Sequence, residues 1–159
     1  MRRTPTDRVA IFFGTAVYSG YFPFFPGTVG AAAGVVLYLV LVGLGVLSAG
    51  HPLGWVVSIA VLFVAGVVSA HRCEVLFGPD NKRIVVDEVW GMLVSLYALP
   101  VAWNWILAAF LVFRFFDIVK PFPGRRAEKM GGGLAIMLDD GIAGVYTAGV
   151  LHLVRLIMG

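Results

Sequence analysis

The sequence is poor in charge. Only 13% of its 159 residues are Asp, Glu, Lys or Arg, whereas 60% are hydrophobic. A soluble domain carries about 25% charged residues, so a water-soluble fold of this length could not cover so much apolar side chain. The length suits a single domain, residues 1–159, and we infer that a lipid bilayer forms part of its solvent.

Other absences narrow the chemistry. The single cysteine, Cys73, excludes an internal disulfide and a cysteine-based zinc site. The chain has no Gly-x-Ser-x-Gly elbow, which removes support for a serine hydrolase. The glycines at 131–133 are not followed by Lys-Ser/Thr, so they do not match a phosphate-binding loop. No basic stripe is interleaved with polar surface, which argues against a nucleic-acid partner.

The apolar runs predict an all-α fold, a polytopic membrane helix bundle with about five spanning helices. A spanning helix needs about 20 apolar residues. Residues 9–25 are also apolar, but glycines and prolines interrupt them and aromatic rings are dense, which favours an N-terminal interfacial or re-entrant segment over a further span. The five expected spans are residues 28–48, 53–70, 88–99, 103–119 and 141–158.

The distribution of basic residues predicts the orientation of these spans. Lys and Arg gather in residues 1–8, 72–83 and 120–129, whereas the turns at 49–52 and 100–102 have none. Because basic residues accumulate in cytoplasmic loops, we expect the N-terminus and both long loops to lie in the cytoplasm. Small residues three or four apart, at Gly27, Gly30 and Gly34 and at Gly141 and Gly144, predict close packing between helices.

Acidic residues gather in three short apolar stretches near the expected cytoplasmic ends of helices. A charge at the centre of a membrane helix costs about 2.5–3.5 kcal/mol on insertion scales, and several carboxylates brought together would repel one another without a cation. Oxygen ligands beside a phosphorylated substrate suit Mg²⁺. Two simpler interpretations stay open, a helix cap at Asp139 and solvated acids at the interface. The five candidate metal-binding and catalytic residues are Asp87, Glu88, Asp117, Asp139 and Asp140.

Basic residues beside these acids indicate a phosphate site. Arg114, Asp117 and Lys120 are spaced three apart, so a helix places them roughly on one face. Pro121 disfavours continuation of the helix through Lys120, so the ammonium group is expected at the mouth of the site. Arg and Lys among carboxylates and a metal can hold phosphate, although a plain ion pair between Arg114 and Asp117 is an equally open interpretation. Together these features predict a metal-dependent enzyme acting on a phosphorylated lipid.

Two other classes of function remain open at this point. An ion-coupled transporter also places carboxylates in membrane helices, although transporters bind near the midplane and between structural repeats, and no repeat is visible here. A non-catalytic membrane scaffold would carry the acids as interfacial groups only. Binding of Mg²⁺ that depends on Asp117 would separate the enzyme from the scaffold.

Four motifs together resemble the bacterial phosphatidylglycerophosphatase A family. They are PGTVG at 26–30, IVVDEVWG at 84–91, FRFFDIVKPFP at 113–123 and LDDGIAG at 138–144. Ala31 stands where a serine commonly follows the first motif, so position 31 is given no polar role. The resemblance extends from about Gly14 to Gly149.

The resemblance implies a Mg²⁺-dependent enzyme of the bacterial inner (cytoplasmic) membrane. Its substrate would be a phospholipid, phosphatidylglycerophosphate, whose terminal phosphomonoester is hydrolysed to give phosphatidylglycerol and phosphate. Arg114, Lys120 and Thr28 would then bind the substrate phosphate, and the five carboxylates would hold the metal. Attack by water and formation of a covalent aspartyl-phosphate are both open routes.

Overall fold

The structure is a computed structural model, and residues 3–48, 52–79, 81–124, 126 and 130–158 are described. Within these residues the chain is helical and contains no strand, which confirms the expected all-α class. The expected outer turn at 49–51 and the basic residues Arg2, Arg125 and Lys129 lie outside the described residues. The elements are α1 (Pro5–Gly14), the 3₁₀ turn η1 (Ser19–Tyr21), α2 (Pro26–Gly43), α3 (Pro52–Phe77), α4 (Val86–Ser95), α5 (Trp103–Val119) and α7 (Gly132–Met158).

Helix α4 is the centre of the bundle, and α2, α3, α5 and α7 all pack against it. Most of its side chains are buried, including Val89, Met92 and Leu93. The indole N–H of Trp90 donates a hydrogen bond of 2.9 Å to the Ile59 carbonyl oxygen of α3. Because these four helices surround α4, the side chains of its first turn lie among them.

The outer surface of the bundle is apolar. Helices α2, α3 and α7 are long and apolar enough to cross a bilayer, and no more than 28% of the apolar window in each is buried inside the protein. Large side chains such as Val64, Leu111 and Ile118 point outward and are 59–73% exposed. An apolar exterior of this kind is stable where lipid replaces water, so the fold is that of a membrane protein.

Five full spans are not confirmed among the described residues, because the central helices are shorter than expected. Helix α4 has 10 residues and α5 has 17. At about 1.5 Å per residue, α4 covers about half of a hydrocarbon core of about 30 Å, and α5 lies at the lower limit for a span. Helix α4 ends at Ser95, whose Oγ donates to the Gly91 carbonyl oxygen of the same helix. The chain then turns at residues 96–99, where Ala98 has a left-handed backbone.

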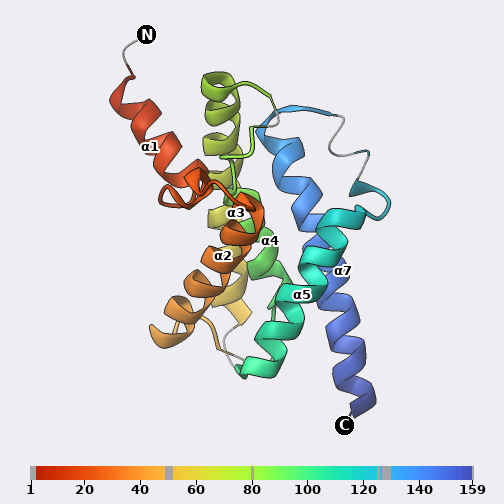
Figure 1. Cartoon of the computed structure of the whole chain (residues 1–159). Coiled ribbons are helices and arrows are strands. Elements are labelled where there is room, and N and C mark those ends of the chain that lie inside the picture. The colour runs from red at the N-terminus through yellow and green to blue at the C-terminus, as the bar shows by residue number, and fades with distance from the viewer. Residues whose placement is uncertain (1–2, 49–51, 80, 125, 127–129, 159) are drawn as a thin grey trace.

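The aromatic N-terminal segment does not form a single long helix. Helix α1 has 10 residues, a tight turn with left-handed backbone at Ala16, Val17 and Tyr18 follows, and η1 leads toward α2. The segment is therefore too short and too broken to span a bilayer by itself. In Figure 1 it lies at the same end of the molecule as the C-terminal end of α3 and the N-terminal end of α7, opposite the C-terminus.

An ion pair that the sequence analysis did not identify, between buried Asp7 and the more exposed Arg72, attaches α1 to α3. Asp7 Oδ1 lies 2.7 Å from both Nε and Nη2 of Arg72. Its other oxygen accepts a hydrogen bond of 2.8 Å from the Thr4 backbone N–H, as part of a capping box. These hydrogen bonds, those of Thr4 first and that of Arg72 next, hold the pKa of Asp7 below its usual range.

Glycines allow the helices around α4 to approach it closely, as expected for Gly30, Gly34 and Gly144. A Cβ added at Gly34 of α2 would lie 2.7 Å from the Cβ of Met92 and 2.9 Å from the Val89 carbonyl oxygen. One added at Gly144 of α7 would lie 2.6 Å from the Gly91 carbonyl oxygen. Small residues therefore bring α2 and α7 into backbone contact with α4, the usual way for helices to associate in lipid.

This packing predicts that Gly34→Ala destabilises the protein by about 1–3 kcal/mol, because the added methyl group has no space against α4. Thermal unfolding in detergent should show a lower Tm. The matched control is Gly43→Ala at the exposed end of α2, where no atom lies within 4 Å of an added Cβ; it should change stability by about 0.5 kcal/mol or less. Equal Tm values for the two variants would contradict the close α2–α4 contact.

Candidate active site

Three carboxylates meet where the first turn of α4 faces α7. One oxygen from each of Asp87, Glu88 and Asp140 can be chosen so that all three lie within 4.8 Å of one another. We call this group the carboxylate triad. Asp87 and Glu88 occupy the first turn of α4, as the sequence predicts, and Asp140 is 4% exposed. Residues separated by more than 50 positions in the chain are thus brought together, which no local pattern specifies.

Asp139 and Asp140 do not begin their helix. Helix α7 starts at Gly132, about two turns before the expected position, so Asp139 is not a helix cap. The expected boundary was wrong because residues 133–138 continue the helical pattern after the left-handed Gly131 and Gly132. Successive helical residues point about 100° apart, so only Asp140 of the two faces α4.

The triad has the oxygen ligands of a cation site, and some of those oxygens lack hydrogen-bond partners. Asp87 Oδ1, Glu88 Oε2 and Asp140 Oδ2 are buried and have no hydrogen-bond partner among the described residues. Buried polar atoms are normally paired, and closely spaced carboxylates repel one another. A hard divalent cation that prefers oxygen ligands, such as Mg²⁺, would satisfy the orphaned oxygens and offset the repulsion.

Asp117 and Arg114 form the next layer beside the triad. Arg114 Nη1 donates to Asp117 Oδ2 at 2.5 Å, so the ion pair considered from the sequence is present. Asp117 also lies close enough to Asp140 to interact with its carboxyl group. The pair uses one of the five N–H donors of the guanidinium group, which leaves others for a ligand.

The N-terminus of α2 adjoins the same group. A Cβ added at Gly27 would lie 2.6 Å from Glu88 Oε1 and 3.2 Å from Arg114 Nη1, so a larger residue there would displace the Glu88 carboxyl group. Backbone N–H groups of a first helical turn lack intrahelical partners and favour anions. Thr28 lies in the same turn and is half-buried, but its neighbour Gly27 is the residue that borders the adjoining groove.

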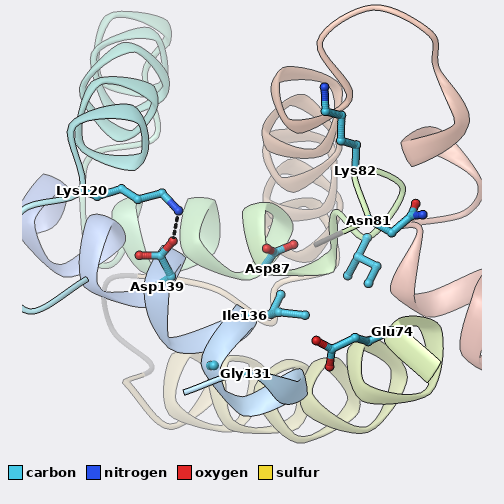
Figure 2. A pocket seen from close by; sticks show the side chains of 10 residues that line it. Glu74, Asn81, Lys82, Asp87, Lys120, Gly131, Ile136 and Asp139 are labelled. Carbon is cyan, nitrogen blue, oxygen red and sulfur yellow. Dashed lines mark hydrogen bonds and ion pairs between the residues drawn. The ribbon is translucent and has the colours of Figure 1, made fainter. Parts of the chain in front are cut away.

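Lys120 and Asp139 lie on a second side of the triad. Helix α5 ends at Val119, as expected from Pro121, and Lys120 has a left-handed backbone. Its ammonium group lies 2.6 Å from Asp139 Oδ2. Figure 2 shows this ion pair beside Asp87 around a small polar cavity of about 170 Å³, whose lining also includes Glu74, Asn81 and Lys82.

A larger opening also reaches the first turn of α4 and shares Lys82 and Ile84 with the polar cavity. Its volume is about 820 Å³, and it is lined by residues 20–27 and 82–84 together with Glu88 and Arg114. We call it the aromatic groove, because Phe22, Phe24 and Phe25 on its wall are 53–79% exposed. The triad therefore lies between two openings, with Asp87 facing the polar cavity and Glu88 facing the aromatic groove.

Sequence reasoning missed several residues that line the two openings. Asn81, Lys82 and Arg83 were treated only as part of a basic loop, although Lys82 borders both the polar cavity and the aromatic groove. Their position immediately before the IVVDE motif could have identified them, because residues that precede a helix lie near its first turn. Glu74 lies at the end of the longer α3, which the expected boundary at residue 70 excluded.

Comparison with known proteins points to lipid phosphatases. A family model described as phosphatidylglycerophosphatase A matches residues 12–155. A Bacteroides thetaiotaomicron protein with the provisional name phosphatidylinositol-3-phosphatase is 39% identical over 154 residues, which cover 94% of this chain and 95% of that protein. No solved structure matches this chain.

Two further relatives carry the name phosphatidylglycerophosphatase A. The protein from Haemophilus influenzae is 37% identical, over 95% of this chain and 89% of its own length. The protein from Escherichia coli K12 is 34% identical, over 94% of this chain and 83% of its own length.

The geometry predicts different effects for two neighbouring aspartates. Asp140→Asn removes a triad oxygen and should weaken Mg²⁺ binding by about tenfold or more, whereas Asp139→Asn should weaken it by about threefold or less, because Asp139 faces Lys120. Isothermal titration of the detergent-purified variants with Mg²⁺ measures both. If Asp139→Asn weakened binding as much as Asp140→Asn, the assignment of the cation to the triad would be wrong.

Proposed function

The chain belongs to the phosphatidylglycerophosphatase A family, and from this premise we propose that it hydrolyses phosphatidylglycerophosphate at the carboxylate triad during phospholipid synthesis. Membership of this family makes the protein a phosphatase. The transporter and scaffold interpretations are therefore not favoured. We choose the triad as the site because three of its carboxylate oxygens are buried beside Arg114 and have no hydrogen-bond partner among the described residues.

The reaction is hydrolysis of a phosphomonoester. An oxygen–phosphorus bond forms between water and the terminal phosphoryl group, and the bond from phosphorus to the terminal glycerol oxygen breaks. The glycerol oxygen takes up a proton, which yields phosphatidylglycerol and inorganic phosphate. Negative charge on the phosphoryl oxygens and the leaving oxygen must be stabilised throughout, so cationic groups around the phosphate lower the barrier.

Asp87, Glu88 and Asp140 would hold Mg²⁺, with Asp117 supporting them through Arg114 and Asp140. When bound, the cation polarises phosphoryl oxygens and promotes deprotonation of water. Asp139 is a further ligand candidate from the sequence, and its position beside Lys120 supports a role in orienting that lysine instead. Mg²⁺ fits because the available donors are carboxylate oxygens and phosphate supplies the rest of its ligands.

Arg114 would bind the terminal phosphate from the side of the aromatic groove. Asp117 holds the guanidinium group in place, and Gly27 in the first turn of α2 lies next to it. The backbone N–H groups of that turn and the Thr28 hydroxyl would be further donors to the phosphate. Lys120 approaches from the polar cavity and would offset charge on the phosphoryl group. The planar guanidinium group of Arg114, held by a carboxylate, is well suited to orient a phosphate.

We place the enzyme as a multi-pass protein of the bacterial inner membrane, with the site opening toward the cytoplasmic leaflet. Helices α2, α3 and α7 would span fully, α5 would span at the lower limit of length, and α4 would end within the bundle. Two of the basic segments, on α1 and at the C-terminal end of α3, lie at the end shown uppermost in Figure 1, which supports this orientation.

The name of the Bacteroides thetaiotaomicron relative makes phosphatidylinositol 3-phosphate a second substrate to test. Both lipids carry a phosphomonoester on a headgroup alcohol, and in both a phosphodiester joins that headgroup to diacylglycerol. They differ in the alcohol, a primary hydroxyl of glycerol against a secondary hydroxyl of an inositol ring. The names of the other two relatives favour the glycerol headgroup.

The test is phosphate release by detergent-purified protein from phosphatidylglycerophosphate, phosphatidylinositol 3-phosphate and phosphatidate, with Mg²⁺ or with a chelator. We expect release that requires the cation, is fastest with phosphatidylglycerophosphate, and falls at least about a hundredfold in Asp87→Asn, because a cation ligand is lost. Size-exclusion profiles establish that the variant is folded. Wild-type protein that is folded but releases no phosphate from any of the three lipids would overturn the proposal, and preference for the inositol lipid would change the substrate.

A further inference from the structure

The aromatic groove combines three kinds of surface. Glu88, Arg114 and the first turn of α2 lie next to the carboxylate triad, Lys82 and Arg83 contribute two more cations, and exposed phenylalanines complete the wall. A phospholipid with a phosphorylated headgroup has the same three kinds of group: a terminal phosphomonoester, an inner phosphodiester and apolar chains. The polar cavity, at about 170 Å³ and without exposed aromatic rings in its lining, does not offer this combination.

We propose that Lys82 and Arg83 bind the inner phosphodiester of the substrate and thereby select lipids that carry a second phosphate beyond the scissile one. This inference rests on the proposed function, since it assumes that the terminal phosphate is hydrolysed at the triad. It assigns the residues that distinguish a two-phosphate lipid from phosphatidate, whose only phosphate is the monoester itself.

The backbone that carries the two cations is held in place from both sides. The Arg83 backbone N–H donates to Asn81 Oδ1, and the Asn81 side chain donates to the Phe77 carbonyl oxygen. The Val85 N–H donates to the Gly14 carbonyl oxygen at 3.0 Å. On the side of η1, no Cβ could be accommodated at Gly20, because the Arg83 carbonyl group already lies there. A cationic segment fixed in this way loses little entropy on binding an anion.

The side chains of both cations remain able to bind an anion. The Arg83 guanidinium group stacks over the rings of Tyr21 at 5.0 Å and Phe77 at 5.8 Å. Stacking uses the face of the guanidinium group and leaves its in-plane N–H donors for phosphate oxygens. Lys82 is exposed and forms no ion pair with any residue in the described part of the chain. Figure 2 shows its side chain pointing away from Asp87, so it is not directed into the triad.

Charge balance supports a second phosphate site outside the triad. Arg114 already offsets the charge of Asp117, whereas the three carboxylates of the triad lie close to the scissile phosphate, and one bound divalent cation offsets only part of their negative charge. A substrate with an additional phosphodiester would be repelled further unless cations met the second charge. Lys82 and Arg83 supply those cations in the groove that Glu88 and the exposed phenylalanines also line.

The experiment compares Lys82→Ala, Arg83→Lys and wild-type protein on phosphatidylglycerophosphate and phosphatidate in neutral detergent micelles. Lys82→Ala should raise KM for phosphatidylglycerophosphate about tenfold with kcat nearly unchanged, and leave KM for phosphatidate within about twofold, because it removes one charged hydrogen bond from the diester alone. Lys82→Arg should restore most of the loss. Arg83→Lys keeps the charge and should raise KM for phosphatidylglycerophosphate only a few-fold.

An inhibition assay uses probes that separate the two phosphates. Glycerophosphoglycerol, a water-soluble phosphodiester, should inhibit wild-type protein competitively and should inhibit Lys82→Ala about tenfold less well. Inorganic phosphate should inhibit both equally, because it binds at the triad. Arg8→Ala, which removes an exposed cation of α1, is the matched control and should behave as wild type in every assay.

The outcomes are distinguishable. Equal rises in KM for both lipids, in Lys82→Ala or also in Arg8→Ala, would mean that these cations only attract the protein to anionic surfaces, and would overturn the inference. Unchanged kinetics in Lys82→Ala with an active wild-type enzyme would overturn it as well. Absence of activity toward every lipid in folded wild-type protein would instead refute the proposed function on which the inference rests.

Discussion

The burial of a polar helix end inside an apolar bundle is the constraint on which the rest of this structure depends. Helix α4 is enclosed by α2, α3, α5 and α7, yet its first turn carries Asp87 and Glu88. Buried carboxylates without partners are costly, so the surrounding helices must supply either counter-charge or a bound cation. The ion pairs Arg114–Asp117 and Lys120–Asp139 supply counter-charge. The triad oxygens that lack hydrogen-bond partners among the described residues are available to a cation.

Close approach of the helices makes that arrangement possible. Glycines at Gly27 and Gly30 bring the start of α2 against Glu88, and Gly91 and Gly144 bring α7 against α4. In lipid there is little hydrophobic gain from pairing helices, so dense packing of small residues provides the association energy. The same glycines that hold the bundle together therefore also set the distances within the candidate active site. A substitution at one of them would change both the stability of the protein and the geometry of the site.

The short length of α4 positions the site relative to the longer helices. Because α4 ends within the bundle while α3 and α7 continue past its first turn (Figure 1), the triad lies below one end of the longer helices rather than on an exposed surface. Two openings reach it, one small and polar, one large and lined by aromatic side chains and cations. A site with these two openings can meet a lipid on one side while remaining in contact with water on the other.

The sequence by itself determined the class of the protein, and much of the chemistry of its site. Low charge and long apolar runs required a membrane helix bundle, Pro121 ended α5 before Lys120, and the acidic motifs carried the family resemblance. Only the tertiary structure decided that Asp140 and not Asp139 joins Asp87 and Glu88, that α4 is a short central helix, and that Lys82 and Arg83 border the groove. The physical reason is that composition and local pattern report solvent preference and helix ends, whereas the direction of each side chain follows from helix rotation and packing between segments distant in the chain.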